Sequence, residues 1–555
     1  MLLGLCSCSA VEEDDDDKIG GNVDTSFELT PDTAFTDRDL SDEYDVAGST
    51  VITLSGSEVK ISGAGASASG SHITVSGDGS YIISGELTDG TLTVDAHKSA
   101  KPHIILSGAS ISSSNASPIY IKECDKLFIT LADGTENYLA GGDSFTATGD
   151  GADGVIFSRQ DLTINGSGKL TVSSPKGHGI VSKDDLVIAG GSYKITAASH
   201  GIDANDSIRM TSSTLEISAT ADGLHAENAD DESLGFIYSE SSTVSISCGG
   251  DGISSSASIQ IESGSYSITS LSTSSADSFK GIKSVGTLLV NGASFSMNVK
   301  DDAIHSNTSV VINGGAFEIS TGDDGIHADQ TLYIGGGSIN IAKSYEGLEA
   351  LDIEIAGGDI KIVAKDDGIN AAGGNDNSGT GGSFGGGDSF RPGGRPGPGS
   401  FGGPGGGAPG SGSSNGSIKI SGGKIYMNAS GDGIDANGTL AISGGEITVC
   451  GPTSGDTSVL DYDKEASITG GTFIGTGSKM MAQSFSSSSQ GVIAVTLNTK
   501  SANERITITA SDGAVILDYT PALAYQLIVI SMPSIQKGET YTLSVGSSTN
   551  SIVAK

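Results

Sequence analysis

Residues 323–328 have the sequence Asp-Asp-Gly-Ile-His-Ala, and residues 366–371 repeat it as Asp-Asp-Gly-Ile-Asn-Ala. This repeat motif consists of two acidic or polar residues, Gly, Ile or Leu, a polar residue, and Ala or Ser. Five of the ten intervals between copies are 22 residues when the glycine, or the alanine that replaces it, is taken as the marker, and the others are 25, 29, 29, 21 and 65. A period of this length predicts a solenoid of stacked coils. The markers are Gly154, Gly179, Gly201, Gly223, Gly252, Gly281, Ala303, Gly325, Gly347, Gly368 and Gly433.

Each repeat contains three short segments that alternate as β-strands do, with a Gly-Gly pair between the second and the third. In the repeat at Ala303 the segments are residues 302–306, 309–313 and 316–320, and the pair is Gly314-Gly315. Glycine suits a corner that needs positive φ. Three strands in about 22 residues predict an all-β fold, a parallel β-helix with a rise of about 4.8 Å per coil. A leucine-rich repeat is excluded because the repeat has no Asn column and no helical half.

Changes in pattern divide the chain into four predicted parts. Residues 1–19 form a signal and acidic tether, and residues 20–148 form an N-terminal β-rich cap with irregular first coils. Residues 149–489 form the β-helix, interrupted at 373–416 by a Gly/Pro-rich segment that we expect to be a mobile loop. Residues 490–555 have longer strand-like runs and are predicted to form a C-terminal β cap.

The charge and the cysteines indicate an exported protein. Asp and Glu number 67 against 29 Lys and Arg, a net charge of −38 that argues against nucleic acid or an anionic membrane surface as partner. An apolar run ends in Leu-Cys-Ser-Cys at residues 5–8, like the signal of a bacterial lipoprotein, so Cys8 is the predicted acylated residue. The alternative is a simple secretion signal. We expect a monomer at the bacterial cell surface, with buried thiols at Cys124, Cys248 and Cys450.

Stacking would place the acidic residues of neighbouring motifs in register. Adjacent carboxylates about 4.8 Å apart repel by about 3.5 kcal/mol at an effective dielectric constant of about 20. Clustered carboxylate oxygens suit Ca²⁺, whereas the interleaved His305 and His327 favour a transition metal but complete no His/Cys ligand set. Solvated, screened carboxylates without an ion are the other interpretation. The predicted calcium ligands are Asp301, Asp302, Asp323, Asp324, Glu346, Glu349, Asp366, Asp367, Asp432 and Asp435.

Two lysines, Lys280 and Lys283, occupy the same columns one coil before Asp302. One interpretation is that they form salt bridges to the acidic residues. The other is that one of them, beside bound Ca²⁺, abstracts the proton next to a uronate carboxylate, as a polysaccharide lyase requires.

Several features together resemble a family of bacterial surface proteins, the carbohydrate-binding-domain-containing proteins. They are the repeat motif, the strand-Gly-Gly-strand unit, residues 117–122 and 161–168, and the Gly/Pro-rich segment. The resemblance implies a right-handed parallel β-helix with several calcium ions, similar in fold to the family-nine pectate lyases. It also implies binding of acidic polysaccharides such as polygalacturonate, and of cellulose. The sequence departs from the acidic pattern at Ala303, His178 and His200.

The leading functional hypothesis is therefore a surface-anchored module that binds acidic polysaccharide through Ca²⁺. A calcium-dependent lyase and a structural adhesin without a sugar ligand are the alternatives. The chain has no Trp and only 5% aromatic residues, which argues against the aromatic platforms on which cellulose chains stack.

Overall fold

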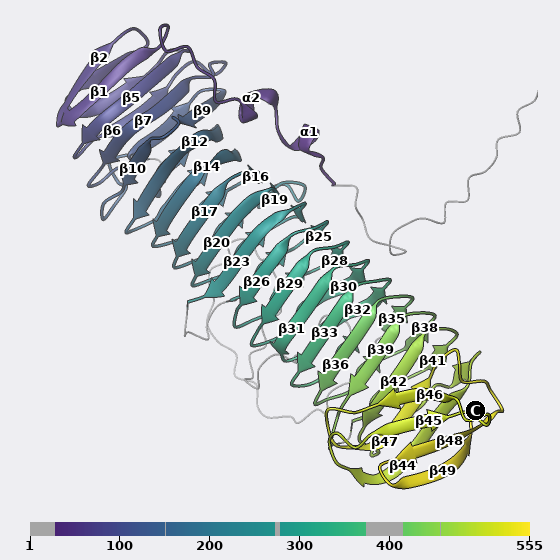
Figure 1. Cartoon of the computed structure of the whole chain (residues 1–555). Helices are drawn as coiled ribbons and strands as arrows, with labels where there is room; N and C mark the ends of the chain where they lie inside the picture. Colours follow the sequence, from purple (N-terminus) through teal and green to yellow (C-terminus); the bar gives the residue numbers. More distant parts are fainter. Residues whose placement is uncertain (1–27, 150, 272–277, 373–414, 456) are drawn as a thin grey trace, which may run out of the picture.

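The computed structural model describes residues 28–149, 151–271, 278–372, 415–455 and 457–555, which form an elongated all-β solenoid (Figure 1). This part contains two four-residue helices, α1 (Pro31–Ala34) and α2 (Asp37–Leu40), and 49 strands. Of these strands, 45 belong to one large and mostly parallel sheet. The prediction of an all-β repeat fold is confirmed. Cys8 and all but the last two residues of the Gly/Pro-rich segment lie outside the described residues.

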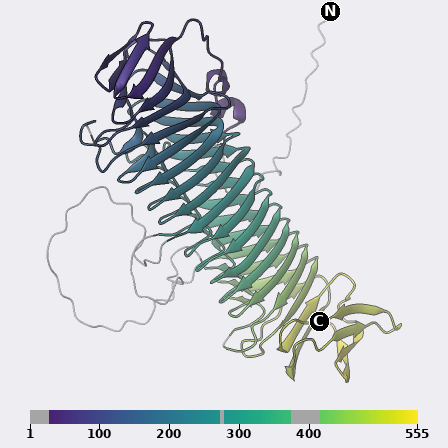
Figure 2. The ribbon, with the colours of Figure 1, turned by 60° about the vertical axis from the view of Figure 1, so that its left-hand side comes forward.

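Each coil contributes one strand to each of three columns of stacked strands, seen side-on in Figure 2. Column A follows the repeat motif and comprises β4 (His72–Val75), β6 (Thr91–Asp95), β8 (Ile119–Glu123), β11 (Gly154–Ser158), β13 (His178–Ser182), β15 (Ile202–Ala204), β18 (Leu224–Ala226), β21 (Ile253–Ser255), β24 (Ile282–Ser284), β27 (Ile304–Ser306), the first parts of β30 (Ile326–Ile334) and β32 (Leu348–Ile355), β34 (Ile369–Ala371), β37 (Ile434–Ala436) and β40 (Asp461–Tyr462).

Column B precedes the Gly-Gly corner and column C follows it. Column B comprises the first parts of β1 (Thr50–Gly56), β5 (Ser80–Leu87) and β7 (His103–Ser112), β9 (Lys126–Leu131), the first parts of β12 (Asp161–Ser174) and β14 (Asp185–Ala197), β16 (Ser207–Thr211), β19 (Phe236–Glu240), β22 (Ile259–Ile261), β25 (Leu288–Val290), β28 (Ser309–Ile312), the second parts of β30 and β32, β35 (Ser417–Ile420), β38 (Thr439–Ile442), β41 (Glu465–Ile468) and β43 (Ser487–Ser488). Column C comprises the second parts of β1, β5 and β7, β10 (Glu136–Ala140), the second parts of β12 and β14, β17 (Thr214–Ala219), β20 (Ser242–Cys248), β23 (Gly264–Ser270), β26 (Ser294–Asn298), β29 (Ala316–Ser320), β31 (Ser338–Ser344), β33 (Asp359–Ala364), β36 (Lys424–Ala429), β39 (Glu446–Cys450) and β42 (Thr472–Gly477).

The register of column A places the motif isoleucines on top of one another inside the solenoid. Ile304 pairs with Ile326, and Ile326 pairs with Leu348. All three side chains are fully buried. The alignment inferred from the sequence is wrong by one residue at its first copy, because Ile156 pairs with Ile180 and not with Val181. The core-facing isoleucine, rather than the marker glycine, sets the register there.

Glycine is needed at two kinds of position for two different reasons. A Cβ on the marker Gly201 would lie 2.7 Å from the carbonyl oxygen of Gly223, so the close coil-to-coil contact leaves no room for a side chain in this coil, whereas the coil of Ala303 accommodates a methyl group. The second glycine of the Gly-Gly corner instead has positive φ, 112° at Gly315 and 96° at Gly358. The corner assigned from the sequence is therefore confirmed.

Antiparallel strands lie at both ends of the solenoid. β1 pairs with β2 (Glu58–Ser62), and β3 (Ala66–Ser69) pairs with β4. At the other end β47 (Tyr525–Ser531) pairs with both β42 and β44 (Val492–Lys500). A separate four-stranded sheet contains β45 (Ile506–Thr509), β46 (Val515–Tyr519), β48 (Thr540–Val545) and β49 (Ser548–Val553). The division of the chain into four parts stays a prediction. The capping role of the two ends and the right-handed sense of the coil also stay predictions.

An N-terminal segment, residues 28–44, lies along the outer face of column B (Figure 1). The side chain of Gln260 donates a hydrogen bond to the carbonyl oxygen of Leu29, and Phe35 packs edge-on against Tyr238 with ring centroids 5.8 Å apart. Farther along the segment, buried Asp39 accepts a hydrogen bond from Thr163 at 2.5 Å and pairs with Lys126 at 2.8 Å. The segment thereby joins coils that are more than 130 residues apart in the sequence. No helix of the described residues is long and apolar enough to span a membrane.

Truncation of a core aromatic side chain tests this packing. Phe295 is stacked between Tyr266 and Phe317, with ring centroids 5.1 and 4.8 Å apart. We expect Phe295→Ala to lower the free energy of unfolding by about 3–5 kcal/mol, because it removes a buried ring and leaves a cavity. Denaturant unfolding followed by circular dichroism measures the change, with Phe295→Leu as the conservative control. An unfolding midpoint equal to that of the wild type would contradict the stacked core.

Candidate metal centre

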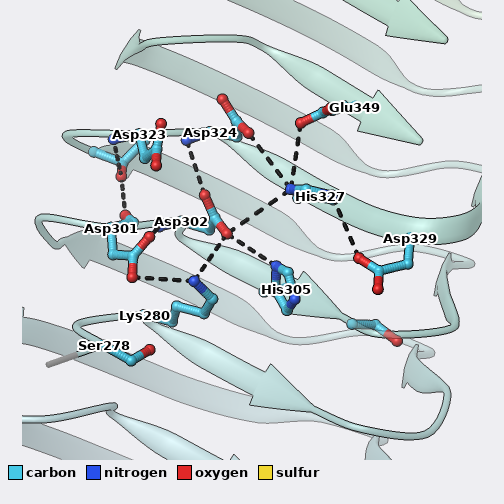
Figure 3. A network of polar contacts seen from close by, with 12 residues as sticks. Ser278, Lys280, Asp301, Asp302, His305, Asp323, Asp324, His327, Asp329 and Glu349 are labelled. Atoms are coloured by element: carbon cyan, nitrogen blue, oxygen red, sulfur yellow. Dashed lines mark hydrogen bonds and ion pairs between the residues drawn. The ribbon is translucent and has the colours of Figure 1, made fainter. Parts of the chain in front are cut away.

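The polar residues of the repeat motif line one corner of the solenoid and the start of column A (Figure 3). In the column two residues after the marker, His305 pairs with His327, and His327 pairs with Glu349. The column continues through Asn370 to Asp435. The predicted register of acidic and histidine side chains is confirmed in these coils.

In six coils the aspartate before the marker uses one carboxylate oxygen to hold the next coil. Asp302 Oδ1 accepts a hydrogen bond from the backbone N–H of Asp324 at 3.1 Å. Asp324 Oδ1 accepts one from the N–H of Glu346 at 3.0 Å. Asp367 and Asp432 accept the equivalent bonds from the coils that follow them. These acidic residues therefore have a structural role, and in Asp302 and Asp324 the second oxygen is the one directed toward other side chains.

Lys280 neutralises the first acidic coil. Its Nζ lies 3.0 Å from Asp301 Oδ2 and 3.2 Å from Asp302 Oδ2, and its side chain is buried. Burial alone would lower the pKa of Lys280, but the Asp302 and Asp301 carboxylates raise this pKa well above its usual range. Burial would likewise raise the pKa of Asp302, but Lys280 and His305 hold it far below its ordinary value. Lys280 is thus a bound ammonium in a salt bridge.

His327 lies among carboxylates from three consecutive coils (Figure 3). Its Nδ1 is 3.3 Å from Glu349 Oε2, 3.5 Å from Asp324 Oδ2 and 4.0 Å from Asp302 Oδ2. Burial opposes a charge on the ring, but the acidic neighbours, Asp324 first, raise the pKa of His327 to about 9. The neighbouring His305 donates a hydrogen bond from Nδ1 to Asp302 Oδ2, 2.9 Å away.

Asp323 belongs to a second, all-carboxylate group with Asp301 and Asp302. One oxygen from each of these three residues lies within 4.8 Å of the others. Burial and the charges of Asp302, Asp324 and Asp301 raise the pKa of Asp323 to about 8. Its Oδ1 is buried and accepts no hydrogen bond.

A third group, at the far end of the column, consists of Asp367, Asp432 and Asp435, whose ligand oxygens also lie within 4.8 Å of one another. Burial is the main cause of the raised carboxyl pKa values, about 8 for Asp367, about 7 for Asp432 and about 6 for Asp435. Neighbouring carboxylates add to each shift. In the described part of the chain no Lys, Arg or His forms an ion pair with these three residues. They therefore form the least compensated acidic group of the column.

Two predicted calcium ligands lie outside these groups. Both carboxylate oxygens of Glu346 accept hydrogen bonds from the Asn370 amide, at 3.1 and 2.9 Å. Asp366 accepts a hydrogen bond from the Tyr345 hydroxyl, and this bond together with burial raises the pKa of Tyr345. Lys283 is buried in column A and pairs in register with His305.

Sequence reasoning missed Asp461, which extends the acidic column by one coil. Asp461 pairs in register with Asp435, and its charge helps raise the pKa values of Asp432 and Asp435. Its coil has Val459 where the motif has Gly, or Ala in one coil, so the motif does not identify this coil. The Leu460-Asp461 pair, which resembles Ile434-Asp435, is the signal that identifies it.

Comparison with known proteins places the chain in a family. A family model described as "Carbohydrate-binding domain-containing protein" matches residues 69–325. A carbohydrate-binding domain-containing protein of Acetivibrio thermocellus is 39% identical over 208 residues, which cover 37% of this chain and 73% of that relative. The chain therefore belongs to the carbohydrate-binding domain-containing protein family. A solved structure of a polysaccharide lyase-like protein from C. thermocellum, a gadolinium derivative, is 26% identical, covers 51% of this chain and 96% of its own, and has a TM-score of 0.37.

Removal of the Lys280 ammonium tests the salt bridge. We expect Lys280→Met to lower the free energy of unfolding by about 3–5 kcal/mol at pH 7, because buried Asp302 loses its main counter-charge. Chemical denaturation measures the loss, and exposed Lys361→Met is the control. If the two variants unfold at the same denaturant concentration, the ion pair does not stabilise the coil.

Proposed function

We propose that this protein binds an acidic polysaccharide of the polygalacturonate type through Ca²⁺ held at the motif corner. The observation that carries the proposal is the group Asp367, Asp432 and Asp435, which offers three carboxylates within 4.8 Å of one another and no basic partner in the described residues. The family description supplies the ligand class, a carbohydrate.

The donor chemistry of this group fits a calcium ion. Ca²⁺ prefers six to eight oxygen ligands, and carboxylates with nearby backbone carbonyls supply oxygen only. Asp461 lies next in the column and offers a further carboxylate. Burial first, and the neighbouring carboxylates second, raise the pKa values of these three groups, so a cation would stabilise their ionised forms. Asp301, Asp302 and Asp323 are a second candidate, less favoured because Lys280 already neutralises two of them.

The charge of the whole chain makes a bridging cation necessary for this ligand. A protein of net charge −38 repels a polyuronate at long range. A metal ion bound to both partners reverses this local repulsion. Within the same proposal we place the protein at the bacterial cell surface as a monomer, lipid-anchored at Cys8.

The lyase alternative receives less support from the geometry. A lysine can abstract a proton only as a neutral amine, and Lys280 is an ammonium held by two carboxylates. The adhesin alternative, with no sugar ligand, is separated from the proposal by the binding experiment below.

Affinity electrophoresis tests the ligand. We expect polygalacturonate in a native gel with Ca²⁺ to retard the protein and a chelator to abolish the retardation. Asp432→Asn with Asp435→Asn should weaken binding by at least about tenfold, because they remove charged metal ligands, while exposed Asp359→Asn should behave as wild type. If neither polygalacturonate nor the chelator changes the mobility of the protein in the gel, the result would favour the adhesin. Absorbance from a 4,5-unsaturated product, lost in Lys280→Ala or Lys283→Ala, would favour the lyase.

Melting curves at two pH values test the ion. The carboxyl pKa values of Asp367, Asp432 and Asp435 are raised above the ordinary 3.8, so between about pH 4 and pH 8 the folded state binds more protons than the unfolded state. The stability of chelated protein should therefore fall as the pH rises through this window. Ca²⁺ should raise the melting temperature more at pH 8 than at pH 5, because it binds the ionised carboxylates. If Ca²⁺ raises the melting temperature of Asp432→Asn as much as that of the wild type, the ion binds elsewhere.

A further inference from the structure

His327 lies between two buried carboxylates in an arrangement that differs in chemistry from the calcium candidates (Figure 3). We propose that Asp324, His327 and Glu349 form a site for a divalent transition metal of the Zn²⁺ class. This inference does not rest on carbohydrate binding, because the three residues lie in different coils from Asp367, Asp432 and Asp435.

The distances within the triad are those of metal ligands. His327 Nδ1 is 3.5 Å from Asp324 Oδ2 and 3.3 Å from Glu349 Oε2. Ligands bound to Zn²⁺ at roughly 2.0–2.2 Å in a tetrahedron lie about 3.3–3.6 Å from one another. The three donor atoms lie within 4.8 Å of one another in all pairings. Little reorganisation is needed to bring them to one ion.

The surroundings hold each donor in place. Glu349 is fully buried and Asp324 is 3% exposed. The N–H of Glu346 binds Asp324 Oδ1 and leaves Oδ2 directed at His327. Behind the ring, His327 Nε2 lies 3.6 Å from Asp329 Oδ1. At this separation Asp329 forms no hydrogen bond with the ring, but its negative charge favours a proton on Nε2, which leaves Nδ1 as the ligand atom.

Charge and donor type select the ion. Two carboxylates and one imidazole have a formal charge of −2, which a divalent cation cancels. An imidazole nitrogen favours Zn²⁺, Co²⁺ or Ni²⁺ over Ca²⁺, which prefers oxygen alone. The competitor is a proton on His327, so binding at Nδ1 releases that proton: the imidazolium gives up H⁺ as the metal–nitrogen bond forms.

Two neighbouring histidine groups are weaker candidates. Asp302 Oδ2, in the group with His305 and His327, is already bound by Lys280 and His305. In the group of His200, Asp222 and His225, the His200 Nδ1 accepts a hydrogen bond from the Asp222 N–H at 3.1 Å. A metal ion at either place would have to displace an existing bond.

Cobalt spectroscopy on the full chain tests the site. We expect one equivalent of Co²⁺ to give the strong visible absorption of four- or five-coordinate Co²⁺. Zn²⁺ should abolish this band, and a large excess of Ca²⁺ should not. His327→Gln and Glu349→Gln should each weaken Co²⁺ binding by about 10–100-fold or more. Exposed His97→Gln and the calcium variant Asp432→Asn are the controls and should keep the band.

The absence of a visible band in the wild type, or its survival in His327→Gln, would overturn the proposal. X-ray absorption of the Zn²⁺-loaded wild type covers the case in which the variants do not fold, because a spectrum without imidazole scattering also rejects the site. Retardation by polygalacturonate should be unchanged in His327→Gln. The two proposals therefore fail independently.

Discussion

In-register parallel pairing of consecutive coils is the constraint on which the rest of the molecule depends. Ile304, Ile326 and Leu348 stack because the coils that carry them have equal length, and this stacking fixes every side chain on the outer surface as well. The marker glycine permits the close approach, since a Cβ there would meet the next coil's backbone. The same periodicity therefore sets both the core and the spacing of the charged groups.

Stacking places like charges side by side, and the protein resolves this conflict differently from coil to coil. Near Asp302 a lysine supplies the counter-charge, and at Glu346 the Asn370 amide satisfies both oxygens. Within the described residues, the coils of Asp367, Asp432 and Asp435 have neither a lysine counter-charge nor a side-chain amide bound to these carboxylates. What distinguishes the calcium candidate is therefore a missing compensation rather than a higher number of acidic residues.

The sequence predicts the periodic part of this structure well, because periodicity is a local property of the chain. The motif isoleucines, the Gly-Gly corner and the columns from His305 to Asp435 all follow from spacing alone. The error at Ile156 arose where Gly154 and Gly179 lie at different distances from their core-facing isoleucines. Asp461 was missed because Val459 replaces the marker.

Contacts that cross between columns could not be predicted in the same way. Spacing places Lys280 beside the acidic column, but only side-chain directions show that it binds Asp301 and Asp302 together. The Asp329 carboxylate behind His327 lies outside the motif, and a counterpart two residues after a histidine occurs in only one other coil, where Glu227 lies 3.5 Å from His225 Nε2. The N-terminal segment on column B joins residues so distant in sequence that no repeat pattern contains the information.

The bonds from each motif carboxylate to the next coil's amide make the corner modular. Asp302 holds Asp324, and Asp324 holds Glu346, but no carboxylate of this series reaches two coils away. Exchange of an aspartate in one coil therefore alters these amide bonds only in the coils next to it. Insertion or loss of one whole coil by gene duplication or deletion would change the acidic surface in steps of about 4.8 Å. The corner is therefore a linear array of coils. Mutation can change the polar side chains of this array one coil at a time.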